Sequence, residues 1–117
     1  MKNKINPVLK IFLAMPGGRG EPFCGPGMIS LLEHIAETSN VRMACEKMDM
    51  SYSKGWKLLK ALESYMECPA TLRRQGGNGG GDSHLTEEGA KFLKRYRDFE
   101  SECNRSMNKI FTKHYGA

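Results

Sequence analysis

Apolar side chains recur at helical spacing in the first half of the chain. A helix is expected over residues 27–38, on a buried stripe formed by Ile29, Leu32, Ile35 and Ala36. A short second helix is expected over residues 41–48, with a buried face formed by Val41, Ala44, Cys45 and Met48. Ser39 or Asn40 can cap this second helix, because short polar side chains accept hydrogen bonds from free N–H groups of a first turn. Asp49 and Met50 then interrupt the pattern, and Asp tolerates turn geometry well.

The third helix is expected over residues 51–67, with Ser51 as its N-cap and Pro69 after its end. Its apolar side consists of Tyr52, Gly55, Leu59, Leu62 and Met66, with Trp56 at the margin. Its polar side consists of Ser53, Lys57, Lys60 and Ser64, with Lys54 and Ala61 at the edge. Since only a short turn separates this helix from the second one, the pattern is typical of a helix-turn-helix motif.

Strand patterns flank the helical region on both sides. Residues 6–15 are rich in β-forming side chains and predict a strand, whereas residues 16–27 are expected to form a loop. Two further short strands are expected at residues 71–74 and 83–85. The glycine-rich segment 76–81 between them predicts a hairpin tip, and hence the wing of a winged helix. The expected fold class is mainly α with a small β-hairpin: a winged helix-turn-helix plus a long C-terminal helix.

A long final helix is expected over residues 86–113, capped by Thr86. Apolar side chains recur along it with the heptad spacing of a coiled coil. The seam expected to pair two copies of the chain consists of Phe92, Tyr96, Phe99, Cys103, Met107 and Ile110. A domain of this size cannot bury so long a stripe, so a homodimer is predicted, with packing back on the same domain as the alternative. Residues 1–85 are thus predicted to form the winged helix-turn-helix domain, and residues 86–117 the dimerisation helix.

Composition narrows the class of function. The 117 residues are enough for about one domain with one modest core. The formal net charge of +5 favours polyanionic partners, such as nucleic acid or an anionic membrane surface. No apolar stretch reaches the roughly 18 residues of a membrane span and no signal peptide is recognisable, so a cytoplasmic protein is expected. No nucleophile–base pair, paired carboxylate or cofactor motif stands out, so neither an enzyme nor a bound cofactor is predicted.

The chain has 4 cysteines, Cys24, Cys45, Cys68 and Cys103, without the close pairs that are typical of zinc sites. They are expected to be free thiols that behave as small apolar residues in a reducing compartment. No metal site is therefore expected. A thiol-based redox-responsive regulator is an alternative hypothesis for the function.

The polar side of the third helix is the candidate reading surface for duplex DNA, because lysine neutralises phosphates and both lysine and serine hydrogen-bond to base edges. The predicted contacts on this helix are Ser51, Tyr52, Ser53, Lys54, Lys57 and Lys60. Of these, Ser53, Lys54 and Lys57 are expected in the major groove, and Ser51 and Tyr52 near phosphate. The wing adds Arg73, Arg74, Gly77, Asn78 and Gly79. A nucleotide-binding loop is not expected there, because no lysine followed by serine or threonine follows the glycines.

Three runs of residues carry a resemblance to a known family. They are Phe-Cys-Gly-Pro-Gly-Met-Ile-Ser-Leu-Leu at residues 23–32, Met-Ser-Tyr-Ser-Lys-Gly-Trp at residues 50–56, and the glycine-rich segment followed by Leu-Thr-Glu-Glu-Gly at residues 85–89. Together they resemble the N-terminal DNA-binding domain of ModE-type molybdate-responsive regulators, which is related to the LysR-type winged helix-turn-helix. The resemblance implies transcription regulation by a dimer, with the third helix in the major groove and the wing near the DNA backbone.

The chain departs from the family pattern at several positions. Family members often carry a basic residue in place of Ser53, alanine in place of Gly55, lysine or arginine in place of Asn78, and a small polar residue in place of Arg42. Gly55 is expected to weaken its helix by about 1 kcal/mol relative to alanine. Because Ser53 and Asn78 reduce the basic charge, a winged helix that binds protein instead of DNA is a second alternative. The molybdate-binding domains of full regulators are not recognisable, so no small-molecule effector is predicted, and the expected partners are double-stranded DNA and a second copy of the chain.

Overall fold

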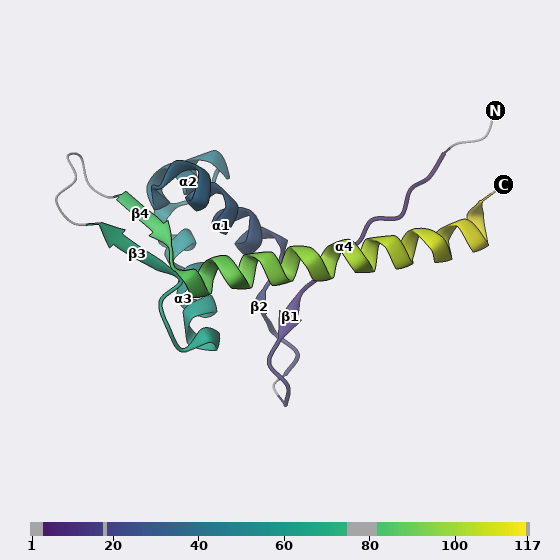
Figure 1. Ribbon diagram of the computed structural model, residues 1–117, viewed down its shortest axis with the longest axis horizontal. Helices are drawn as coiled ribbons and strands as arrows, with labels where there is room; N and C mark the ends of the chain where they lie inside the picture. The colour runs from purple at the N-terminus through teal and green to yellow at the C-terminus, as the bar shows by residue number, and fades with distance from the viewer. Residues whose placement is uncertain (1–3, 18, 75–81, 117) are drawn as a thin grey trace.

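Four helices and two short antiparallel hairpins make up the described part of the chain, shown in Figure 1 as a computed structural model. The structure describes residues 4–17, 19–74 and 82–116. In chain order the elements are β1 (Leu13–Ala14), β2 (Pro22–Cys24), α1 (Pro26–Thr38), α2 (Val41–Lys47), α3 (Tyr52–Met66), β3 (Thr71–Arg74), β4 (Asp82–Leu85) and α4 (Glu87–Tyr115). Strand β1 pairs with β2, and β3 pairs with β4. The fold is a mainly α winged helix-turn-helix with a long C-terminal helix, as the sequence predicts.

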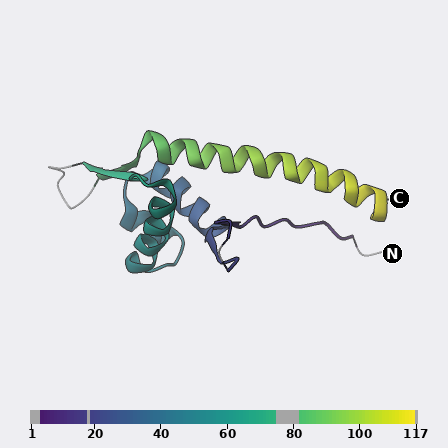
Figure 2. The same cartoon turned by 90° about the horizontal axis from the view of Figure 1, so that it is seen from below.

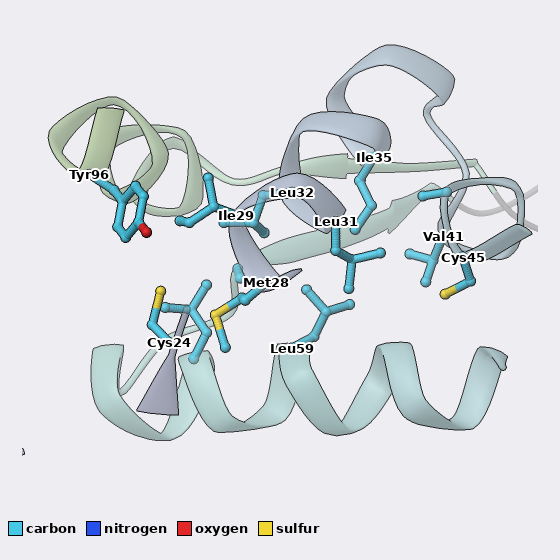
Figure 3. Packing of buried hydrophobic residues seen from close by; sticks show 13 residues of the cluster. Cys24, Met28, Ile29, Leu31, Leu32, Ile35, Val41, Cys45, Leu59 and Tyr96 are labelled. Carbon is cyan, nitrogen blue, oxygen red and sulfur yellow. The ribbon is translucent and has the colours of Figure 1, made fainter. Parts of the chain in front are cut away.

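Helix α1 lies at the centre of the hydrophobic core. Figure 3 shows its apolar side chains between Leu59 of α3 and Tyr96 of α4. The fully buried side chains of α1 are Met28, Ile29, Leu31, Leu32 and Ile35. The predicted stripe is therefore confirmed except at Ala36, which is exposed. The buried face also includes Met28 and Leu31, so its centre lies on the side of the helix away from Ala36.

The N-terminal region differs from the sequence prediction. Of the strand expected over residues 6–15, only Leu13 and Ala14 are paired, and the expected loop over residues 16–27 contains β2. The paired positions are Leu13 with Cys24 and Ala14 with Pro22. β-forming side chains favour an extended backbone but do not supply a partner, and the three residues of β2 are too few to pair with a longer strand.

Helix α4 gives the molecule its elongated shape, with extents of 59 × 38 × 23 Å. Its first half packs on the core, and its second half extends beyond it. Figure 2 shows the N-terminal segment extending away from the helical core in the same direction as this second half. Among the described residues, no helix combines the length and the apolar character that a membrane crossing requires.

Candidate nucleic-acid interface

Local hydrogen bonds set the turn between α2 and α3. Asn40, and not Ser39, caps α2, because its Oδ1 accepts from the Met43 N–H at 2.9 Å. Asp49 adopts a left-handed φ of 52° and so reverses the chain after α2. Ser51 then caps α3 as predicted, since its Oγ accepts from the Lys54 N–H at 3.0 Å. These caps fix where α3 begins and how it leaves the turn.

The two faces of α3 differ in the way that the sequence predicts. Gly55, Leu59 and Leu62 are buried against the core, and Tyr52 and Trp56 are half-buried with their rings edge to face at 6.1 Å. The opposite face is exposed and contains four of the predicted DNA contacts: Ser53, Lys54, Lys57 and Lys60. Burial of one face therefore presents the polar face to the surroundings as a continuous surface.

Gly55 has a packing role that the sequence prediction missed. A Cβ at this position would overlap the Sγ of Cys45, which is buried in α2 directly opposite. The Cys45 thiol occupies the space that a side chain at position 55 would take. Because Gly55 has no side chain, α3 can pack closely against α2. The glycine is unfavourable for helix propensity, but it allows the helix-turn-helix to pack.

The wing is attached to the core along its base. Thr71 pairs with Leu85 and Arg73 with Ser83 in the β3–β4 ladder. The Ser83 N–H donates to the Ser39 carbonyl at 2.8 Å, and the Thr86 N–H donates to the Ala70 carbonyl at 2.9 Å. Of the predicted wing contacts, Gly77, Asn78 and Gly79 lie outside the described residues, and only the backbone of Arg74 in β3 is described.

Arg73 lies next to the start of α3, because its Nη2 donates to the hydroxyl of Tyr52 at 3.3 Å. The guanidinium of Arg42, from the first turn of α2, lies over the same ring at 4.3 Å from its centroid. Two predicted contact residues are thus brought together, and Arg42 joins them. Arg42 was not among the predicted contacts, because no local sequence pattern shows that α2 faces Tyr52.

Among the described residues, the cations on this surface form no ion pairs with carboxylates. The ion pairs among the described residues join His34 to Glu37, Lys91 to Glu87, Lys94 to Asp98, and Arg97 to Glu33 and Glu100. All of these residues belong to α1 and α4. The described cations of α2, α3 and β3 are therefore available to an anionic partner.

The predicted dimer seam on α4 divides into two parts. Tyr96 is 3% exposed, and its hydroxyl donates to the Ile11 carbonyl at 2.7 Å within the same chain. Phe92 is half-buried against Phe23 and Tyr65. The other four seam residues, together with Leu9, line a shallow groove. These four are Phe99, Cys103, Met107 and Ile110. Phe99 and Ile110 are more than half exposed.

The four cysteines are free thiols, as the sequence predicts. Burial raises the pKa of the Cys24 thiol to about 11 and also raises the pKa of the Cys45 thiol. Since the thiolate is the reactive form, both thiols are poorly suited to redox chemistry. A redox role would have to involve Cys68 or Cys103, which are only half-buried.

The turn, the exposed face of α3 and the wing place the protein in the winged helix-turn-helix class. Within that class, the chain is 31% identical over 74 residues to the DNA-binding transcriptional dual regulator ModE of Escherichia coli, a match that covers 63% of this chain. It is 27% identical over 82 residues, or 70% of its length, to the molybdenum transport protein ModE of Azotobacter vinelandii. The predicted resemblance to the N-terminal domain of ModE-type regulators is thereby confirmed.

The similarity covers a limited part of these relatives. The match spans 28% of the E. coli protein and 30% of the Azotobacter protein. A third relative, the molybdenum-pterin-binding protein MopA of Rhodobacter capsulatus, is 27% identical over 75% of this chain and 33% of its own length. No protein-family model matches the chain.

Proposed function

We propose that this chain is a sequence-specific transcription regulator that binds duplex DNA through α3 and the β3–β4 wing. The main support is the exposed polar face of α3, which consists of Ser53, Lys54, Lys57 and Lys60. This face has no carboxylate partner among the described ion pairs and lies beside a basic wing. The E. coli relative, named as a DNA-binding transcriptional regulator, supports the same reading.

In this proposal, the first turns of α3 enter the major groove. Ser53, Lys54 and Lys57 would then lie nearest the base edges, with Lys60 closer to a phosphate. The hydroxyl of Ser51 already accepts the Lys54 N–H, so its main contribution is to fix the start of the helix. Arg73 would approach the backbone from the wing side. Phosphate contacts supply affinity and orientation, and the groove contacts supply sequence preference.

We further propose that two copies pair through the second half of α4. Phe99 is 52% and Ile110 is 59% exposed, and both border the groove that also contains Cys103 and Met107. A second copy would cover this apolar face by the heptad packing predicted from the sequence. Tyr96 contributes to the fold of each chain and not to this contact. The dimer would present two α3 helices to a site with two-fold symmetry.

The test is a selection from a pool of random duplex DNA, followed by titration of the enriched sequence at two salt concentrations. Enrichment of a palindromic site, with affinity falling steeply as salt rises, is expected because phosphate contacts release counterions. Salt-sensitive binding without enrichment would contradict sequence specificity. No binding at either salt concentration would overturn the proposal and favour a protein-binding winged helix.

A matched pair of variants locates the surface. K54A/K57A removes two lysines from the exposed face of α3, whereas K109A/K113A removes two exposed lysines from the far end of α4. Both variants change the net charge equally. Only the first is expected to lose the selected site, and equal weakening by both would indicate that overall charge, and not the α3 surface, drives binding.

A further inference from the structure

Three side chains from three different elements meet at the junction of the helix-turn-helix and the wing. They form the arginine–tyrosine cluster, which consists of Arg42 from α2, Tyr52 from α3 and Arg73 from β3. The Arg42 Cζ lies 4.3 Å from the centroid of the Tyr52 ring, and the Arg73 Nη2 donates to the Tyr52 hydroxyl at 3.3 Å. Tyr52 therefore contacts two guanidinium groups, one through the face of its ring and one through its hydroxyl.

The two guanidinium groups have unused hydrogen-bonding capacity. Each offers five N–H donors in a planar arrangement. Among the described residues, Arg73 makes one side-chain hydrogen bond, to Tyr52, and Arg42 makes none. Neither takes part in the ion pairs of the described chain, which all lie on α1 and α4. Both guanidinium groups thus contact the same tyrosine, and within the described part of the chain neither has a carboxylate partner.

The position of Arg42 is unfavourable for the helix that carries it. It lies in the first turn of α2, where the helix dipole disfavours a cation. Contact with the Tyr52 face offsets part of this cost, and the edge-to-face contact of Tyr52 with Trp56 holds the ring in place. An anion between the two arginines would relieve both their mutual repulsion and the effect of the dipole. Guanidinium pairs with phosphate oxygens in a planar, two-pronged geometry.

We propose that Arg42 and Arg73 together bind a single backbone phosphate of duplex DNA, with Tyr52 positioning both side chains. This inference rests on the proposed function and identifies a contact that the sequence did not reveal. Because α2, α3 and β3 each contribute one residue, the phosphate would fix the wing relative to α3 when DNA binds. The cluster thereby sets the register of the protein on the duplex.

The experiment measures affinity for the selected duplex across a salt series, with R42A, R73A, R42A/R73A and the control R105A. Arg105 is an exposed arginine on the distal part of α4. Each single variant of the cluster is expected to bind about tenfold more weakly, as for one lost charged hydrogen bond, and R105A to bind normally. The double variant should reduce the slope of log affinity against log salt by about 0.9, the value for one phosphate.

Several results would overturn this assignment. Normal binding by R42A, or equal weakening by R105A, would show that the cluster is not a phosphate site. A slope reduction of about 1.8 in the double variant would indicate two separate phosphates. Failure of the unaltered protein to bind any duplex would instead overturn the proposed function, and this contact with it.

A second pair of variants tests the positioning role of Tyr52. Y52F keeps the ring beneath Arg42 but removes the hydroxyl that accepts from Arg73. It is expected to weaken binding by about threefold, less than R73A, as for one neutral hydrogen bond. Y52F/R73A should bind no more weakly than R73A alone, because the hydroxyl acts through Arg73. Additive losses would show that the hydroxyl contacts DNA independently and would contradict positioning.

Discussion

The two halves of α4 have different surroundings, although one apolar pattern runs through both. In the first half, Tyr96 is 3% exposed and its hydroxyl bonds to the backbone of Ile11. In the second half, Ile110 is 59% and Tyr115 is 68% exposed. Periodicity therefore identifies which face of a helix is apolar, but the rest of the fold decides whether the same chain covers that face.

The change occurs where α4 leaves the core. Among the described residues, an ion pair joins α4 to α1 at this point: the Nε and Nη2 of Arg97 donate to the two carboxylate oxygens of Glu33 at 2.8 and 2.5 Å. Beyond it, Leu9 of the N-terminal segment borders the groove on the apolar face of α4. The first half thus packs against the core of its own chain, and the second half keeps an exposed apolar face, on which the proposed dimer depends.

The largest expected effect contrasts two tyrosines of the same helix. Y96A should lower the free energy of unfolding by about 3–5 kcal/mol, because it leaves a cavity where a large ring was buried. Y115A should change it by only about 0.5 kcal/mol, since Tyr115 is largely exposed and its ring stacks on Phe111 at 5.0 Å. Urea unfolding at a concentration where both variants are monomeric gives the comparison. Similar losses in the two variants would contradict the division of α4 into two halves.

The second prediction concerns assembly. F99E/I110E places charges on the exposed apolar face and should raise the dimer dissociation constant by at least about 100-fold, or about 2.7 kcal/mol. The unfolding free energy of the monomer should change little. Sedimentation equilibrium measures the first quantity, and N108E, on the opposite side of the helix, is the control. A dimer that survives F99E/I110E would place the contact elsewhere.

The third prediction compares two glycines with different surroundings. G55A should destabilise the protein by about 1–3 kcal/mol, despite the better helix propensity of alanine, because the new methyl group overlaps the Cys45 Sγ. G27A, with nothing within 4 Å of its Cβ, should be neutral or slightly stabilising. Thermal unfolding of both variants checks the direction of each change.

The double variant C45A/G55A decides whether overlap is the cause. Cys45→Ala removes the sulfur and so makes room for the new methyl group at position 55, and the double variant should therefore be more stable than G55A alone. A G55A protein that is as stable as the unaltered chain would show that helix propensity, and not packing, dominates at this position.

Local signals account for what the sequence predicted correctly. The caps at Ser51 and Thr86, the left-handed Asp49 and the ends of β3 all depend on residues within one turn of each other. The buried and exposed faces of α3 follow from helical periodicity alone. The central elements of the fold and most of the candidate contact surface were therefore predictable.

Contacts between distant residues account for what the sequence could not show. The run over residues 6–15 has strand character, but pairing depends on β2, which looked like part of a loop. Arg42 joins the candidate site only because α2, α3 and β3 meet at Tyr52. The Tyr96 hydroxyl finds its hydrogen-bond acceptor in the carbonyl of Ile11, 85 residues earlier in the chain. None of these pairings has a signature in spacing or composition.

The smallest expected effect concerns the ion pair that ends the packed half of α4. The hydrogen bonds from Arg97 lower the pKa of Glu33, with further lowering by the charges of Arg97 and His34, against the opposing effect of burial. Both side chains are more than a third exposed, so solvent screening limits the gain to below about 1 kcal/mol. The gain is full above the unfolded-state pKa and is lost as the pH falls through the lower folded-state value.

E33Q should therefore be slightly less stable than the unaltered protein at neutral pH, and the two unfolding free energies should converge as the pH falls through the lowered folded-state pKa of Glu33. E87Q is the matched control, because it removes an exposed ion pair within α4 that does not reach the core. If the E33Q difference stayed constant as the pH falls, the charge of Glu33 would contribute nothing to holding α4 on α1, and apolar packing around Tyr96 alone would mark where the buried half of the helix ends.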